Sequence, residues 1–316
     1  MSDGEGSIGA GAGANKCLNR TPCAISRHVE RCASHTPEQN APMPPLADIA
    51  TVLAINFALC LAGFFLLWLL ACAIRDPSFI DSVWALGMGG LALATYLQVD
   101  GAEPRKLLLL GLGGAWALRL GLHLLLRWRA HGADRRYVRM MANAKAERGW
   151  DFPEASLKLV FALQAPLMWT VALPVQLGQM STTPAAIGLL GWIGAALAAV
   201  GILFETVGDA QITRFKADPA NAGKVMDRGL WRYTRHPNYF GDILTWVGLY
   251  LIAAETPLGL WALPGPVLLI FLLTRFSGGI TYERRLTKSR PGYDDYQRRT
   301  SPLIPWPPKP ASVDSV

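Results

Sequence analysis

A block of polar residues directly precedes an apolar run in the second half of the chain. In order, the block reads Arg235, His236, Pro237, Asn238, Tyr239, Phe240, Gly241 and Asp242. The apolar run 243–254 follows at once, so these polar groups stand where a segment enters a membrane. At that depth each polar group costs several kcal/mol unless it finds a partner, and such groups usually serve a ligand or a cavity. The block therefore indicates a binding site.

Further residues that could hold a phosphorylated cofactor lie just upstream of this block. They combine carboxylates with cations: Glu205, Asp209, Arg214, Lys216 and Arg232. Arginine and lysine suit phosphate groups, while aspartate and asparagine suit ribose or carboxamide groups. The alternative is an interfacial belt of cations that reach the lipid headgroups. Such a belt needs only cations, so the mixture of group types over 209–242 favours a site, whereas the arginines of 127–148 fit a belt better.

The elements that would position this site are apolar segments long enough to cross a bilayer. Of the 316 residues, 51% are hydrophobic and 17% are charged, whereas soluble domains carry roughly 25% charged residues. A helix needs about 20 apolar residues to span the membrane. We expect seven such spans, at residues 49–74, 78–98, 107–126, 157–177, 185–207, 239–254 and 258–276. The sequence thus predicts an all-α polytopic membrane bundle rather than a large soluble helical enzyme.

The distribution of lysine and arginine predicts the orientation of these spans. Both residue types gather in the links after the third and fifth spans and in the C-terminal tail, and they are absent from the links after the fourth and sixth. Because basic links face the cytoplasm, this alternation places the C-terminus there. The net charge of +7 is explained by this topology and not by nucleic-acid binding.

Residues 1–45 have the composition of a disordered tail, since they are rich in glycine, alanine and proline. Cys17, Cys23 and Cys32 lie in this tail, but their spacing fits no zinc pattern, and no metal site is predicted. Residues 46–308 are expected to form the transmembrane domain, and residues 309–316 a disordered C-terminal tail.

The stretch 229–242, Gly-Leu-Trp-Arg-Tyr-Thr-Arg-His-Pro-Asn-Tyr-Phe-Gly-Asp, resembles the C-terminal signature of the steroid 5-alpha-reductase-like superfamily. It is most similar to the bacterial branch known as the DUF1295 family. The stretch 215–221, Phe-Lys-Ala-Asp-Pro-Ala-Asn, fits the same branch, as do Glu283 and the stretch 290–296. The resemblance covers about residues 46–308.

This resemblance implies an integral-membrane protein, in a bacterial inner membrane, that holds NADPH in a cavity facing the cytoplasm. Its reaction would reduce a carbon–carbon double bond conjugated to a ketone in a lipophilic substrate, such as a steroid or an isoprenoid. Together with the cations found above, the residues expected to bind the cofactor are Asp209, Arg214, Lys216, Arg235, His236, Asn238, Tyr239, Asp242, Tyr282, Glu283 and Tyr296.

The steroid enzymes place a catalytic glutamate on the second span and a tyrosine on the third. Here the second span offers Asp81, and Tyr137 beyond the third span is the nearest substitute for the tyrosine. Reduction of an enone develops negative charge on the carbonyl oxygen, which an acid or a cation must stabilise. We therefore expect Asp81 to act as the acid and Arg119 as the stabiliser, although the two could equally form a buried ion pair. His123 is expected to be a packing or hydrogen-bonding residue.

Two other classes of function remain open on the sequence. The isoprenylcysteine carboxyl methyltransferases have a similar Arg-His-Pro region and use S-adenosylmethionine, but the run 238–242 favours the reductases. A non-enzymatic membrane protein is the third possibility. Beyond a lipophilic substrate and membrane lipids the sequence indicates no partner, and it does not define the oligomeric state.

Overall fold

The computed structural model describes residues 43–276, 283 and 286–310. Contacts group Pro42–Val316 into one unit, apart from Met1–Ala41. The predicted N-terminal disorder, Cys17, Cys23, Cys32 and Tyr282 lie outside the described residues. Within those residues every named element is a helix, and the one isolated β-bridge joins Thr234 to Ser301. The predicted all-α class is therefore confirmed.

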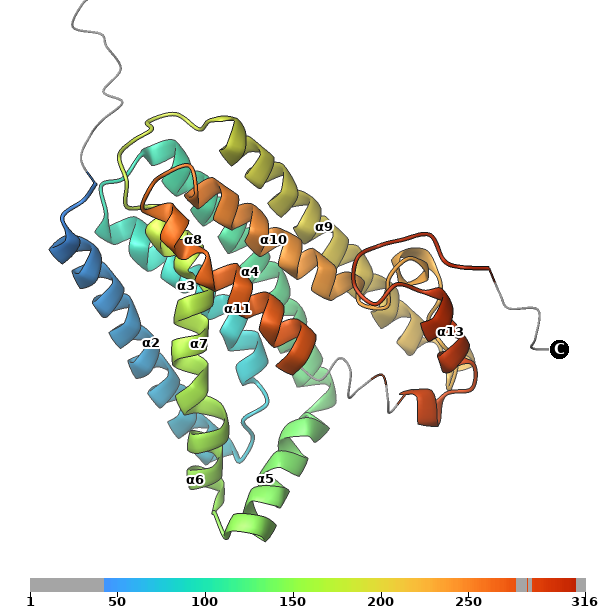
Figure 1. The fold of residues 1–316 in the computed structure, drawn as a ribbon. Coiled ribbons are helices and arrows are strands. Elements are labelled where there is room, and N and C mark those ends of the chain that lie inside the picture. Colours follow the sequence, from blue (N-terminus) through green and yellow to red (C-terminus); the bar gives the residue numbers. More distant parts are fainter. Residues whose placement is uncertain (1–42, 277–282, 284–285, 311–316) are drawn as a thin grey trace, which may run out of the picture. The chain divides into compact units, whose positions relative to one another are not determined.

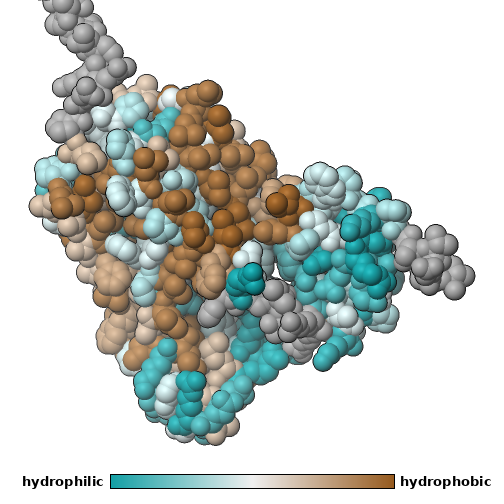
Figure 2. All heavy atoms as spheres, in the orientation of Figure 1, coloured by the Kyte–Doolittle hydropathy of each residue, from teal (hydrophilic) through white to brown (hydrophobic). Residues whose placement is uncertain are grey.

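Four helices of the described chain are long and apolar enough to cross a membrane. They are α2 (Leu46–Ile74), α3 (Ile80–Gln98), α4 (Glu103–His131) and α9 (Leu189–Ala217). They correspond to the first, second, third and fifth predicted spans. Large apolar side chains such as Leu66, Leu97, Leu118 and Leu203 are exposed on them, and Figure 2 shows apolar surface over much of this bundle. An exposed apolar surface of this extent is what a lipid-facing bundle requires.

The other three predicted spans are interrupted or shorter helices. The fourth is built from α6 (Phe152–Ser156), a π-turn η1 (Leu157–Phe161), α7 (Ala162–Val171) and α8 (Leu173–Leu177). The sixth is α10 (Pro237–Ala253), and the seventh joins η4 (Gly259–Ala262), α11 (Pro264–Phe271) and η5 (Leu272–Phe276). Pro174 and Pro264 stand in the first turns of α8 and α11, where a proline is tolerated because its missing backbone N–H would have no partner in the helix. The total of seven crossings stays a prediction.

The polar links also contain helices. The stretch predicted as a link after the third span holds α5 (Arg135–Arg148), which begins where the side chain of Asp134 accepts a hydrogen bond from the backbone N–H of Arg136. Two 3-10 turns, η2 (Pro219–Asn221) and η3 (Gly229–Arg232), connect α9 to α10, and α13 (Tyr293–Arg299) lies near the C-terminus. Figure 2 shows hydrophilic surface over α5 and around α13.

Glycines allow α9 and α10 to pack along each other at very short distance. A Cβ atom added to Gly241 of α10 would lie 2.6 Å from the backbone nitrogen of Glu205, and one on Gly201 of α9 would lie 2.6 Å from the carbonyl oxygen of Gly241. Gly194 and Gly248 make a similar approach further along the pair. Small residues at such an interface are the usual means by which membrane helices approach closely. This packing fixes the position of α10 along the axis of α9, and so decides which residues of the two helices face each other.

The core of the bundle extends from α2 across α3 and α7 to the contact of α4 with α10. Trp116 and Trp246 are almost fully buried there, with ring centroids 5.2 Å apart in an edge-to-face arrangement. On the side of α2, Asn56 donates hydrogen bonds to Thr95 and to Gln176, which ties α2 to α3 and α8. Polar side chains in lipid are tolerated when they are paired in this way.

Candidate functional site

The most concentrated polar cluster inside the bundle lies between α4, α9 and α10. Arg119 of α4 makes ion pairs with two carboxylates of α9, at 2.9 Å to Glu205 Oε1 and 2.6 Å to Asp209 Oδ2. His123 Nε2 lies 3.9 Å from Asp209 Oδ2, and Asp242 of α10 interacts electrostatically with Glu205. We call Glu205, Asp209 and Asp242 the inner carboxyl cluster. Buried ionisable groups of this kind within a membrane segment usually mark a functional site.

Several polar atoms of this region are buried and lack a hydrogen-bond partner among the described residues. Three of them are acceptors: Glu205 Oε2, Asp242 Oδ1 and Asn238 Oδ1. The Nε1 donor of Trp116 lies near the carboxyl groups of Glu205 and Asp242 but completes no hydrogen bond. Because a buried unpartnered group costs about 1–3 kcal/mol, this arrangement favours a bound molecule that brings donors.

Cations gather near the C-terminal ends of α4 and α9. Lys216 of α9 is in electrostatic range of Arg127 on α4 and of Arg290 near the C-terminus. Arg290 also donates a hydrogen bond to the carbonyl oxygen of Lys224. We call Lys216, Arg127 and Arg290 the mouth cations. No ion pair joins any of the three to a carboxylate of the described residues, so their repulsion is relieved when an anion binds.

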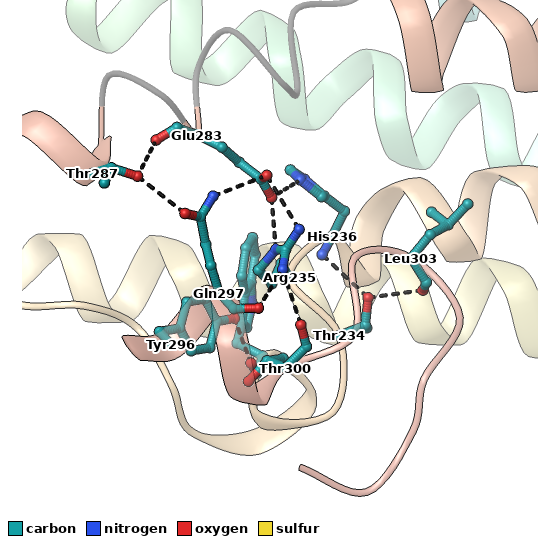
Figure 3. A network of polar contacts seen from close by, with 10 residues as sticks. Thr234, Arg235, His236, Glu283, Thr287, Tyr296, Gln297, Thr300 and Leu303 are labelled. Carbon is teal, nitrogen blue, oxygen red and sulfur yellow. Dashed lines mark hydrogen bonds and ion pairs between the residues drawn. The ribbon is translucent and has the colours of Figure 1, made fainter. Parts of the chain in front are cut away.

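The residues of the Arg235–Asp242 signature divide between two environments. Asn238 and Asp242 point into the cluster inside the bundle, where the side chain of Asn238 interacts with Asp209. Arg235 and His236 instead bind the C-terminal segment, and Figure 3 shows both turned toward the carboxylate of Glu283. The distances from Glu283 Oε1 are 2.8 Å to Arg235 Nε and 2.9 Å to His236 Nε2.

Arg235, His236, Glu283 and Gln297 form what we call the C-terminal clasp. Arg235 Nη1 donates to the carbonyl oxygens of Gln297 and Thr300, and Gln297 Nε2 donates to Glu283 Oε2 (Figure 3). Burial by itself would raise the pKa of Glu283, but the hydrogen bonds from His236 and Arg235 outweigh it and hold this pKa below its usual value. The clasp fastens the segment that carries Arg290 to the connection between α9 and α10.

The remaining predicted cofactor residues lie near the clasp or at the surface. Tyr296 donates a hydrogen bond of 2.5 Å to the carbonyl oxygen of Trp231, and burial raises the pKa of its phenol above the usual value. Tyr239 stacks on the ring of His236 with centroids 5.0 Å apart. Arg214 is exposed on the last turns of α9. Helix α10 begins inside the signature, at Pro237, with His236 as its N-cap residue.

Two of the predicted catalytic residues meet at the start of α3. The hydroxyl of Tyr137 donates to Asp81 Oδ1 at 2.7 Å, and Arg136 Nη2 lies 2.7 Å from Asp81 Oδ2. Burial and the adjacent Asp81 carboxylate raise the pKa of Tyr137 above its usual value. Arg136 also pairs with Asp134, whose pKa is held low by hydrogen bonds from Arg136 that outweigh its burial. Asp81 and Tyr137, which the sequence offered in place of the glutamate and tyrosine of the steroid enzymes, are thus in direct contact.

Arg119 does not join this pair. A Cβ on Gly121 would lie 3.2 Å from the carbonyl oxygen of Ser82, which shows that Gly121 faces α3. Arg119, two residues earlier, reaches Asp209 of α9. Residues two apart on a helix point roughly 200° from each other at 3.6 residues per turn. Asp81 of α3 and the side chain of Arg119 therefore lie on opposite sides of α4, and the alternative buried ion pair between them is not found.

Sequence reasoning left several residues of this region out of the site. His123 was expected to be a packing residue, Arg127 to belong to an interfacial belt, and Trp116 was not considered. Arg290 lay in a recognised motif without a role, and Glu205 was named with the polar residues upstream of the signature but not among the expected cofactor ligands. Only the convergence of α4, α9 and the C-terminal segment brings them together, and that convergence cannot be obtained from spacing along the chain.

These features define an all-α membrane protein with a polar site inside its bundle. A family model described as "Protein of unknown function (DUF1295)" matches residues 67–300, and the chain belongs to this family. The chain is similar to the uncharacterized protein C594.04c of Schizosaccharomyces pombe, with 22% identity over 211 residues. That alignment covers 60% of this chain and 60% of the yeast protein. No solved structure matches.

Proposed function

We propose that the protein is an NADPH-dependent membrane reductase that acts on a carbon–carbon double bond conjugated to a ketone in a lipophilic substrate. The observation that supports this most is the order of charge along α9. From the C-terminal end of α9 toward the interior of the bundle, Lys216 and the other mouth cations come first. Asp209 follows, beside Asn238. Glu205 lies deepest, beside Asp242. A dinucleotide has the matching order, since its phosphates carry the negative charge and its nicotinamide carries an uncharged amide.

The mouth cations fit the phosphate end of such a cofactor. Lysine and arginine bind phosphate oxygens through charge-assisted hydrogen bonds. The clasp helps to place Arg290, since it binds the same C-terminal segment to the signature. Deeper in the bundle the carboxylates of Glu205 and Asp209 would repel anionic groups. The favourable location for the phosphates is therefore beside the mouth cations.

The inner end fits a neutral group that donates hydrogen bonds. The unpartnered acceptor oxygens of Asn238 and Glu205 would receive N–H or O–H donors from a carboxamide or ribose. When bound, NADPH supplies a hydride. The residues of this chain hold the amide end, keep bulk water away from it through Trp116 and Trp246, and place Arg119 where negative charge can be stabilised.

The lipophilic substrate and the orientation are parts of the same proposal. The surface around the site is apolar and consists of membrane-spanning helices, so a substrate dissolved in the bilayer would reach the site from the side. The mouth cations and the C-terminus would face the cytoplasm, where NADPH is available, as the positive-inside rule predicts. The catalytic roles predicted for Asp81 and Tyr137 stay predictions, because both residues lie on the side of α4 away from Arg119.

Ligand-dependent thermal unfolding of the purified protein in detergent tests this function. NADPH at 100 times its dissociation constant is expected to stabilise the protein by about 2.7 kcal/mol, which raises the unfolding temperature measurably. S-adenosylmethionine is the comparison ligand. Stabilisation by S-adenosylmethionine alone would support the methyltransferase class, and stabilisation by neither ligand would support a non-enzymatic membrane protein.

A further inference from the structure

The inner carboxyl cluster contains more acidic groups than its cations can balance. Glu205 and Asp209 share the single guanidinium of Arg119, and His123 is the one other basic side chain within 4 Å of either carboxylate in the described part of the chain. Arg127 and Lys216 act on Asp209 only from a longer distance. Asp242 has no ion pair within 4 Å among the described residues, although it is buried and faces Glu205, Asp209 and Arg119. An isolated carboxylate in such a place is unfavourable, because burial and like charges both oppose it.

The surroundings of Asp242 also point to a bound reactant. Its Oδ1 atom is buried without a partner, and the Nε1 atom of the fully buried Trp116 lies beside it, also without a partner. Asn238 is one helical turn away on the same side of α10, where the amide end of the proposed cofactor would lie. Asp242 is therefore next to the reacting end of the site, whereas both oxygens of Asp81 are already engaged by Tyr137 and Arg136.

We propose that Asp242 carries a proton in the folded protein and is the acid that gives this proton to the substrate. The inference rests on the proposed reductase function. As the electron pair of the double bond moves to the carbon next to the ketone, that carbon takes the proton from Asp242. The second hydrogen and two electrons come from the hydride of bound NADPH at the other carbon. Asp242 is left as a carboxylate, stabilised by Arg119, and must regain a proton from the cytoplasm.

The structure also contains a route for that proton. Side-chain exposure rises from 3% at Glu205 to 12% at Asp209 and 30% at His123, in the direction of the cytoplasmic end of α9. His123 is within 3.9 Å of Asp209, and both can carry protons. Chains of aspartate, glutamate and histidine within membrane segments commonly serve as proton relays. His123 and Asp209 would be positioned to return the proton without touching the substrate.

Infrared spectroscopy of the purified protein at neutral pH tests the proton directly and needs neither substrate nor cofactor. The carbonyl stretching band of a protonated carboxyl group is expected in the wild type and is expected to disappear in Asp242→Asn. It should persist in Glu205→Gln, and in Asp218→Asn, which changes an exposed aspartate that caps η2. A band that survives Asp242→Asn, or one that disappears in Glu205→Gln alone, would overturn the assignment.

Binding of NADPH to the same variants separates this inference from the proposed function. Asn and a protonated Asp have similar size and are both neutral, so Asp242→Asn should bind NADPH within about threefold of the wild type. A loss of tenfold or more would show that Asp242 is a cofactor ligand and would contradict the acid role. If the wild type binds no NADPH, the proposed function fails, while the infrared result still decides whether Asp242 holds a proton.

Discussion

At the scale of single residues, α9 carries opposite charges at two positions along its length, a buried carboxylate inside the bundle and an exposed lysine near its C-terminal end. Lys216 and Glu205 are separated by roughly 16 Å along the axis, at about 1.5 Å per residue. Glu205 is 3% exposed and ion-paired with Arg119, whereas Lys216 is exposed and is repelled by Arg127 and Arg290. The two ends of the site therefore select different chemical groups, and substitutions at the two ends should have different effects.

Lys216→Ala should weaken the binding of NADPH by about tenfold or more. A hydrogen bond to a charged group contributes about 1.5–3 kcal/mol, and 1.4 kcal/mol corresponds to a factor of ten in affinity. Titration of the purified protein, followed by fluorescence, measures the effect. Lys158→Ala is the matched control, because Lys158 pairs with Glu154 on an exposed surface. An unchanged affinity in Lys216→Ala would remove the phosphate role from this cation.

Tyr137→Phe should lower stability without changing cofactor affinity. The lost hydrogen bond to Asp81 is worth about 1 kcal/mol, and Asp81 lies on the opposite face of α4 from Arg119. Thermal unfolding and NADPH titration measure the two properties. Tyr233→Phe serves as the comparison, since the Tyr233 side chain is 43% exposed. A large loss of NADPH affinity in Tyr137→Phe would show that this pair belongs to the cofactor site.

At the scale of elements, the contact between α9 and α10 decides where the signature residues point. Gly241 allows the backbone of α10 to approach that of α9, and this approach sets Asp242 beside Glu205 and Asn238 beside Asp209. The sequence predicted both helices and the polar groups on them. It could not predict this pairing, because glycines in an apolar run do not show which helix they contact.

Gly241→Ala should strongly destabilise the pair of helices. The added Cβ would lie 2.6 Å from the backbone nitrogen of Glu205, where no flexible side chain can move aside. Overpacking of this kind costs about 1–3 kcal/mol or more. Gly63→Ala on α2 is the matched control, since its Cβ would meet no atom within 4 Å. Equal unfolding temperatures for the two variants in detergent would contradict the close packing.

The clasp shows which part of the signature the sequence could not assign. Arg235 and His236 carry the cation and imidazole expected at a cofactor site, but in the structure both bind Glu283, and Arg235 also binds the carbonyl oxygens of Gln297 and Thr300. A guanidinium that binds a phosphate and one that binds a carboxylate look the same in a sequence. The partner of Arg235 lies 48 residues away along the chain, and only the fold identifies it. Their predicted cofactor contacts stay a prediction.

Acidification should open the clasp. Because the pKa of Glu283 is lower in the folded state than its ordinary value of 4.5, the folded state favours the carboxylate. The stabilisation is complete above pH 4.5 and is lost as the pH falls from there through the lower folded pKa. Hydrogen exchange of the α13 amides, compared with those of α4, measures this opening. In Glu283→Gln the exchange rate of α13 should already be high at neutral pH and should not show this transition.

At the scale of the whole molecule, two cations lie at the end of α4 that the topology assigns to the outer side. Arg105 and Lys106 lie in the first turn of this helix, and by sequence alone they count against the positive-inside rule. Both are buried, however. Arg105 donates to the carbonyl oxygens of Gly178, Ser181 and Pro184, and Lys106 pairs with Glu103. The charged groups of both residues are engaged by partners within the protein, so they do not contribute to the charge of an outer loop.

The membrane orientation can be tested with two single-cysteine variants in a background that lacks the five native cysteines. Thr182→Cys lies in the exposed part of the link before α9, and Ser289→Cys is exposed in the C-terminal segment that carries Arg290. A membrane-impermeant maleimide added outside sealed cells or right-side-out vesicles should label the first and spare the second. Inside-out vesicles should give the opposite result. Labelling of both from one side would contradict the odd number of crossings between them, and with it the delivery of cytoplasmic NADPH to the mouth cations.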